Sequence, residues 1–225
     1  MIDLRNECCL EVLSTLQDNS IDLIATDPPY KVTSRGSSGG TGGMLKDTLN
    51  KKGLVFKHNE IKFDDWLPEC YRVLKEGSHC YIMCNNKNLL GMLQSIEKAG
   101  FNVFKTLIWV KNTAITNMYY MDNHEYIIFC RKGKAKKINN CGTKSVLSFD
   151  NPKNKIHPTE KPVELMQVLI ENSSNEGDLV LDPFVGGGAT AIACLNSNRE
   201  CLAIELDEQY YEVTKERIEN HVVEG

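Results

Sequence analysis

Apolar and polar residues along the chain repeat with two periods, one typical of strands and one typical of helices. Short apolar runs bounded by polar turns predict buried strands. Longer stretches with apolar residues three and four positions apart predict amphipathic helices. The expected strands are 21–26, 79–84, 103–110, 125–130, 178–181 and 200–205. The expected helices are 9–16, 64–74, 89–99, 162–172, 189–196 and 208–222.

This alternation of strands and helices predicts an α/β fold with a doubly wound sheet that helices cover on both faces. The length of 225 residues fits one domain. A polar segment at 31–56, rich in Gly and Ser, interrupts the pattern after the first expected strand. Loops of this length inside compact domains are typically lids or binding loops, so we expect a mobile surface loop there.

Composition excludes several classes of protein. Hydrophobic residues make up 41% and charged residues 25%, which is typical of globular chains and not of disordered, collagenous or coiled-coil ones. The sequence contains no apolar run long enough for a membrane span, and its first residues lack the pattern of a secretory signal. We therefore expect a cytoplasmic protein. The nine cysteines lack the spacing of a zinc site, which predicts reduced thiols and no metal.

The net charge of −4 argues against a nucleic-acid partner, but the charge is unevenly distributed. Residues 105–155 contain ten Lys or Arg against three acids. A basic segment between acidic flanks can form a phosphate-facing surface, although a solvated loop would have the same composition. The candidate DNA contacts are the basic residues of its densest part, Arg131, Lys132, Lys134, Lys136 and Lys137.

A glycine-rich turn at 182–190 joins an expected strand to an expected helix. Glycine lets the backbone approach a ligand closely, and a helix N-terminus offers free N–H groups, so this turn favours a nucleotide-like ligand. Glu205 ends the next strand, where nucleotide-binding sheets place an acid that binds ribose hydroxyls. A purely structural strand–helix turn is the alternative. The candidate residues of the turn are Asp182, Pro183, Phe184, Gly186, Gly188 and Thr190.

A second motif, Asp27-Pro28-Pro29-Tyr30, follows the strand at 21–26 and precedes the expected mobile loop. Two prolines stiffen the backbone and leave carbonyl groups without competing N–H donors. The Asp27 carboxylate and the Pro28 carbonyl can accept two hydrogens of an exocyclic amine while the ring stacks on Tyr30. A structural turn with a capping Asp is the alternative.

Together the two motifs resemble those of the amino-methylating DNA methyltransferases, whose hallmarks are D/N/S-P-P-Y/F/W and F-x-G-x-G. The order of catalytic motif, basic segment and cofactor motif is similar to that of the permuted beta group. His-Pro-Thr-Glu-Lys-Pro at 157–162 matches that group's segment before the cofactor motif, and 65–75, 109–112 and 124–125 also resemble the family. The likeness covers nearly the whole chain.

The resemblance implies a Rossmann-like, circularly permuted methyltransferase domain over 1–225, with a small basic target-recognition insertion at about 106–155. It also implies S-adenosylmethionine as the cofactor, with His157, Thr159 and Lys161 at the methionine end of its pocket. The family often has an Asp near the N-terminus for the adenine of the cofactor. This chain has Asn6-Glu7-Cys8 there, which makes Glu7 and Cys8 the candidates.

The expected reaction is site-specific transfer of a methyl group to the exocyclic amine of an adenine flipped out of double-stranded DNA, as in restriction–modification systems. Asp as the first residue of the catalytic motif favours adenine by family tendency. The resemblance further implies a homodimer and a bacterial, archaeal or phage origin. The alternatives are the 4-amino group of cytosine, an RNA or protein substrate, and a DNA-binding protein without catalysis.

Overall fold

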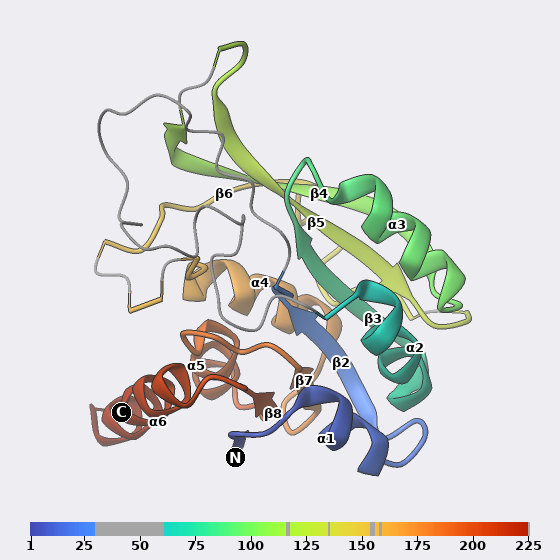
Figure 1. Cartoon of the computed structure of the whole chain (residues 1–225), viewed down its shortest axis with the longest axis vertical. Helices are drawn as coiled ribbons and strands as arrows, with labels where there is room; N and C mark the ends of the chain where they lie inside the picture. Colours follow the sequence, from blue (N-terminus) through green and yellow to red (C-terminus); the bar gives the residue numbers. More distant parts are fainter. Residues whose placement is uncertain (30–60, 116–117, 135, 154–155, 158, 225) are drawn as a thin grey trace.

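The computed structural model describes residues 1–29, 61–115, 118–134, 136–153, 156–157 and 159–224. These residues form one eight-stranded sheet of order β1-β8-β7-β2-β3-β5-β4-β6, with helices on both faces (Figure 1). The strands are β1 (Ile2–Arg5), β2 (Ile21–Thr26), β3 (Leu74–Cys84), β4 (Asn102–Ile115), β5 (Asp122–Arg131), β6 (Val146–Ser148), β7 (Leu179–Asp182) and β8 (Glu200–Ile204). The helices are α1 (Cys9–Thr15), α2 (Phe63–Val73), α3 (Leu89–Lys98), α4 (Val163–Ser173), α5 (Ala189–Asn196) and α6 (Glu208–Glu224).

The central strand β2 lies between β3 and β7 and is parallel to both. From β2 the chain continues to β3 on one side, and it returns through β7 and β8 on the other side. This reversal of direction is a topological switch point, where open α/β sheets bind their ligands at the carboxyl ends of the strands. Only β5 among the described strands is antiparallel to its neighbours. Its first residues therefore reach the same edge as the last residues of β2 and β3.

Alternate side chains of the strands enter two separate cores. In β3, Cys80 and Ile82 face the core formed with α1, α2 and α3, whereas Tyr81 and Met83 face the core formed with α4, α5 and α6. This period of two follows from the pleat of a strand. Because both faces are covered, the inner strands are nearly continuous apolar runs, which made them predictable.

The expected elements are largely confirmed, and β2 has the bounds predicted from the sequence. Two short edge strands, β1 and β6, were not predicted, and β3 begins directly after α2 at Leu74 rather than at position 79. The segment at 106–155, where we expect target recognition, includes most of β4 and all of β5 and β6, which belong to the central sheet. Its role in target recognition stays a prediction. The predicted mobile loop at 31–56 lies outside the described residues.

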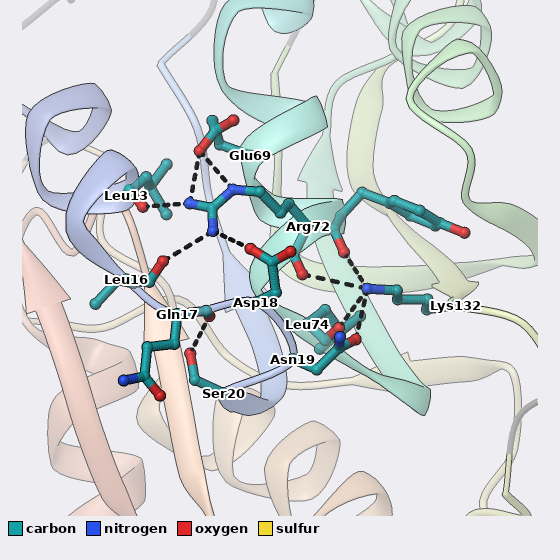
Figure 2. A network of polar contacts seen from close by, with 11 residues as sticks. Leu13, Leu16, Gln17, Asp18, Asn19, Ser20, Glu69, Arg72, Leu74 and Lys132 are labelled. Carbon is teal, nitrogen blue, oxygen red and sulfur yellow. Dashed lines mark hydrogen bonds and ion pairs between the residues drawn. The ribbon is translucent and has the colours of Figure 1, made fainter.

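Arg72, near the end of α2, links α2 to the C-terminal end of α1. Its guanidinium donates to the carbonyls of Leu13 and Leu16, each at 2.8 Å, and pairs with Asp18 and Glu69 (Figure 2). These carbonyls belong to the last turn of α1, whose orphan acceptors need a donor. The contact fixes α1 against α2 on one face of the sheet.

All nine cysteines are free thiols. Among the described residues, no cluster of three or more His, Cys, Asp or Glu could hold a metal ion. No helix in the described part of the chain has the length and apolar character needed to cross a bilayer.

Candidate active site

Three acidic side chains follow three neighbouring strands at one edge of the sheet. Asp27 comes directly after β2, Asp182 ends β7, and Glu205 comes directly after β8. Because β2, β7 and β8 are parallel neighbours, their carboxyl ends lie at the same edge. We call this side of the molecule the carboxyl edge.

One cavity at the carboxyl edge is lined by residues of both predicted motifs. Asp27 lines it after β2, while Asp182 and Gly186 line it from the glycine turn after β7. His157 and Lys161 line it from the segment before α4. Residues far apart in the sequence therefore border one small space, as the two-motif interpretation requires.

A second hollow of about 340 Å³ adjoins this cavity across the ring of Phe184, which lines both. Its walls include Glu7 and Cys8 after β1, Pro183 after β7, and Glu205 after β8. The predicted cofactor residues from the N-terminus and from β8 thus lie together. The two hollows share Phe184, and residues of the glycine-rich turn line both.

The glycine turn has a backbone conformation that residues with a side chain rarely adopt. Gly186 has φ +51° and Gly188 has φ +82°, both in the left-handed region. A Cβ added to Gly187 would lie 2.9 Å from the Cβ of His157. Arg217 of α6 donates to the carbonyl of Gly187 at 2.5 Å and holds the turn from behind. Three glycines are therefore needed for this chain path.

Glu205 closes the other side of the turn. One of its oxygens accepts from the Gly186 N–H and the other from the Asp207 N–H, both at 2.9 Å. Burial raises the pKa of Glu205, and these backbone hydrogen bonds oppose that rise. Each carboxylate oxygen can accept a further hydrogen bond. Asn6 donates its amide to the Glu205 carbonyl at 2.9 Å, so it supports β8 instead of facing the hollow.

Asp182 links the two motifs directly. Its Oδ1 accepts from the Thr26 hydroxyl at 2.6 Å and from the Phe184 N–H at 3.1 Å, and Thr190 also bonds to the carboxyl group. Asp182 is 2% exposed. Burial raises its pKa to about 6, and the three hydrogen bonds only partly offset this effect. Thr26, the residue before Asp27, is thereby hydrogen-bonded to Asp182 at the start of the glycine turn.

The raised pKa of Asp182 predicts a measurable effect on stability. The folded protein binds a proton here up to about pH 6, whereas the unfolded chain releases it near pH 4, so unfolding becomes easier as pH rises through this window. Asp182→Asn keeps the acceptor oxygen and removes the titration. Relative to wild type, its free energy of unfolding should rise by about 2–3 kcal/mol between pH 4 and pH 7 in urea titrations. Parallel curves for the two proteins would contradict this assignment.

His157 and Thr159 shape the wall opposite Asp182. The Thr159 hydroxyl and His157 Nδ1 are 3.2 Å apart, and the imidazole packs edge-on against Tyr210. Burial, with the nearby Lys161 cation, lowers the pKa of His157 to about 4. At neutral pH the imidazole is therefore uncharged and acts as a wall and hydrogen-bonding group.

Lys161 directly pairs with Asp27. Its ammonium lies 2.5 Å from Asp27 Oδ2 and donates to the Thr159 carbonyl at 3.2 Å. Burial raises the pKa of Asp27 and would lower that of Lys161, but the carboxylates of Asp27 and Glu125 outweigh burial and raise the pKa of Lys161. The proton of this pair therefore stays on Lys161 at neutral pH. We expected Lys161 at the methionine end of a cofactor pocket, and it lines that cavity while bonded to the catalytic motif.

Glu125 and Lys111 extend this charged cluster and were not predicted as site residues. Glu125 of β5 lies 3.2 Å from the Lys161 ammonium and also pairs with Lys111 of β4. The pKa of Glu125 is lowered because the two lysines outweigh its burial. The antiparallel direction of β5, which brings Glu125 to the carboxyl edge, has no signal in the sequence. Such a signal would require knowledge of strand pairing.

Pro28 and Pro29 continue from Asp27 along the carboxyl edge, with Pro28 buried and Pro29 half-buried. Tyr30, the expected stacking residue, lies outside the described residues. The Oδ1 atom of Asp27 is buried and has no hydrogen-bond partner among the described residues. A buried acceptor without a donor is costly, so this atom fits a ligand donor such as an amine hydrogen.

The predicted basic DNA contacts lie near the edge of the sheet opposite the carboxyl edge. Arg131 ends β5 and pairs with His79, six residues along the strand from Glu125, which corresponds to roughly 20 Å. Lys136 bonds through its backbone to Gly77 and His79 near the start of β3. Lys134, Lys136 and Lys137 are exposed. The assignment of Arg131, Lys134, Lys136 and Lys137 to DNA contact stays a prediction, for residues distant from Asp27.

Lys132 is also buried, with 7% of its surface exposed. Its ammonium donates to Asn19 Oδ1 and to the carbonyls of Tyr71, Arg72 and Leu74 (Figure 2). A cation with four acceptors at the end of α2 satisfies orphan carbonyls of that helix. Lys132 thus fastens the α2–β3 junction and is not available to a phosphate.

Comparison with known families and curated proteins gives a consistent result. The family model described as DNA methylase matches residues 21–216. The type II methyltransferase M.HpaI of Haemophilus parainfluenzae is 33% identical over 94% of this chain and 72% of its own length. The putative methylase YubD of Escherichia coli K12 is 33% identical over 93% of this chain and 87% of its own length.

Solved structures share the fold. The complex of M1.HpyAVI with SAM has a TM-score of 0.73 at 25% identity, covering 96% of this chain and all of that one. The cytosine-N4-specific PvuII DNA methyltransferase has a TM-score of 0.76 at 16% identity, covering 98% and 90% of the two chains. At that identity the second likeness concerns the fold alone.

Proposed function

The chain belongs to the DNA methylase family, and from this premise we propose that it transfers a methyl group from S-adenosylmethionine to the exocyclic amine of adenine in double-stranded DNA. The observation that carries the proposal is the buried, unpaired Oδ1 of Asp27 in a cavity shared with the glycine turn. We further propose that the enzyme acts as part of a restriction–modification system in the cytoplasm, and that it forms a homodimer.

The residues around the two hollows fit the proposed cofactor. The Gly186–Gly188 turn leaves its backbone close to the cavity, and Glu205 can accept from ribose hydroxyls. Glu7 and Cys8 border the hollow that would hold the adenine, and His157 and Thr159 border the opposite end. When bound, S-adenosylmethionine supplies an electrophilic methyl group.

Asp27 and Pro28 perform the part of the reaction that belongs to the protein. An exocyclic amine is a poor nucleophile because its lone pair is delocalised into the ring. Asp27 Oδ1 accepts one amine hydrogen and the Pro28 carbonyl the other, which localises the lone pair on nitrogen. As the nitrogen gains the methyl group it becomes positively charged, and the Asp27 carboxylate stabilises that charge and accepts the departing proton.

Methyl transfer to nucleic acid tests the proposed function directly. The chain is incubated with S-adenosylmethionine carrying a labelled methyl group and, separately, with plasmid DNA, RNA and protein. We expect label in DNA, and digestion to nucleosides should give N6-methyladenine. Detection of N4-methylcytosine instead would show that the target is cytosine, the alternative base. Label only in RNA or protein would overturn the proposal.

Two exposed lysines at the carboxyl edge are proposed as phosphate contacts, because they lie closer to Asp27 along the sheet than the basic run does. Lys87 follows β3 on one side of the cavity, and Lys153 follows Asn151, which bonds to Asn112 and Thr113 of β4. Both lysines are exposed. A duplex that delivers a flipped base to Asp27 would lie along this edge.

The double variant Lys87→Ala/Lys153→Ala should reduce the magnitude of the slope of log affinity against log salt by about 2, because each phosphate contact that forms releases about 0.9 counterion and two contacts are lost. The matched triple variant Lys134→Ala/Lys136→Ala/Lys137→Ala should leave the slope unchanged, since its lysines lie at the opposite edge. Fluorescence anisotropy with a labelled duplex at several salt concentrations measures both. If instead the triple variant reduced the salt slope and the double variant did not, the phosphate contacts would lie on the basic run.

A further inference from the structure

Asp27 and three charged residues near it form a chain of alternating sign. Lys111 of β4 pairs with Glu125 of β5, Glu125 lies near Lys161 before α4, and Lys161 pairs with Asp27 after β2. The exposed side-chain fractions are 16% for Lys111 and Glu125, 6% for Lys161 and 19% for Asp27. Two cations and two anions thus form a neutral, mostly buried chain of charges.

Such a cluster is weak evidence for a stabilising role. Burying four charges costs desolvation free energy that their attraction only partly returns, and apolar residues of the same volume would often serve the fold as well. The cluster lies at the cavity and ends on the first residue of the catalytic motif. Its position therefore points to a role in the site.

The geometry of Lys161 distinguishes the two oxygens of Asp27. The ammonium donates to Oδ2 at 2.5 Å and to the Thr159 carbonyl at 3.2 Å, and it forms an ion pair with Glu125 at 3.2 Å. With its head held on three sides, Lys161 restrains the rotation of the Asp27 carboxylate. Oδ1 is then the oxygen left without a partner among the described residues.

We propose that Lys161 and Glu125 are positioning residues, which tie back Oδ2 of Asp27 and thereby present Oδ1 to the amine that receives the methyl group. This inference rests on the proposed function for the identity of the amine. It moves the main role of Lys161 from the cofactor to the catalytic carboxylate. It also gives Glu125, which lies in a segment that resembles the family but was not predicted as a site residue, a part in catalysis through Lys161.

The charges that face Asp27 come from five elements. Lys161 and Lys111 lower the pKa of Asp27, whereas burial and Glu125 raise it. Asp182 at the end of β7 and the Cys84 thiol at the end of β3 complete the surroundings, and both have pKa values that burial and the Asp27 charge raise. Removing Lys161 or Glu125 must therefore move the titration of Asp27 in opposite directions.

The test uses Lys161→Met and Glu125→Gln in the full chain without DNA or cofactor. Carboxyl ¹³C NMR, with the Asp27 signal assigned from its loss in Asp27→Asn, should show its apparent pKa rise by about one unit or more in Lys161→Met. In Glu125→Gln the same pKa should fall. Lys98→Met and Glu97→Gln, which change exposed residues of α3, are the matched controls and should leave the titration unchanged.

Kinetics supply the second readout. In both variants kcat for methyl transfer should fall by about tenfold or more, with affinity for S-adenosylmethionine within threefold of wild type. The acid limb of the kcat–pH profile should move with the NMR titration, to higher pH in Lys161→Met and to lower pH in Glu125→Gln. Glu125→Gln is nearly isosteric and keeps the test valid if Lys161→Met does not fold.

Two results would overturn the positioning role: an Asp27 titration that both variants leave unmoved, or a loss confined to cofactor affinity. The NMR titration needs no substrate. It therefore separates a failure of this inference from a failure of the proposed function, which would appear as a wild-type protein that methylates no DNA.

Discussion

Replacing Asp27 by Asn is expected to lower kcat for DNA methylation by about 10²–10⁴-fold, the range typical of a lost acid–base or charge-stabilising group. The change keeps the shape of the side chain but removes the negative charge that stabilises the methylated amine. It also places an amide opposite the Lys161 ammonium, 2.5 Å from Oδ2 in the wild type. The affinity for S-adenosylmethionine, measured by calorimetry, should stay within threefold.

The matched control is Asp64→Asn. Asp64 also pairs with a lysine, Lys98, but on the surface, where the two side chains are 43% and 72% exposed. Surface pairs of this kind contribute little, so activity and stability should remain close to wild type. If Asp27→Asn retained wild-type kcat, the catalytic assignment of the motif would be wrong. Equal losses in the two variants would point to a general effect of removing a lysine partner.

The fold was predictable because its strands are buried on both faces. Runs such as 21–26 carry enough apolar residues to be recognised without any partner, and β2 has the expected bounds. The edge strands β1 and β6 are short and only partly covered, so their residues carry little pattern. Their pairing comes from β8 and β4, which the local sequence does not contain.

The site was predictable where chemistry is local to a motif. Both motifs border one cavity, because each follows a parallel strand of the same sheet. Charge density along the sequence, in contrast, does not say where a segment lies. The run after Arg131 follows an antiparallel strand, so it is carried away from the carboxyl edge. Lys132 within it is buried by acceptors from α2 that are distant in the sequence.

Gly188→Ala should weaken binding of S-adenosylmethionine by about 10–100-fold, the second large effect. Gly188 has φ +82° at the start of α5, a conformation that costs other residues about 1–2 kcal/mol. An added Cβ would also lie 2.8 Å from Cγ2 of Thr214. Relieving either strain moves the turn that borders both hollows, and calorimetry with the cofactor alone measures the loss.

Gly91→Ala is the control that separates a lost glycine from a lost site. Gly91 lies in α3, and a Cβ there would meet no atom within 4 Å. Alanine is the better helix former by roughly 1 kcal/mol, so this variant should be slightly more stable than wild type and bind the cofactor equally well. Equal affinity in Gly188→Ala and Gly91→Ala would remove the glycine turn from the proposed cofactor site.

A second substitution separates the two causes of strain at Gly188. Thr214 is fully buried, and its hydroxyl donates to the Gly186 carbonyl at 2.5 Å, so the side chain cannot rotate away without releasing the turn. Thr214→Ser removes Cγ2 and keeps the hydroxyl. In the Gly188→Ala background it should restore part of the lost affinity, because the steric contact disappears while the left-handed backbone remains unfavourable for alanine. Full recovery would show that contact with Thr214, and not backbone conformation, is what requires glycine at this position.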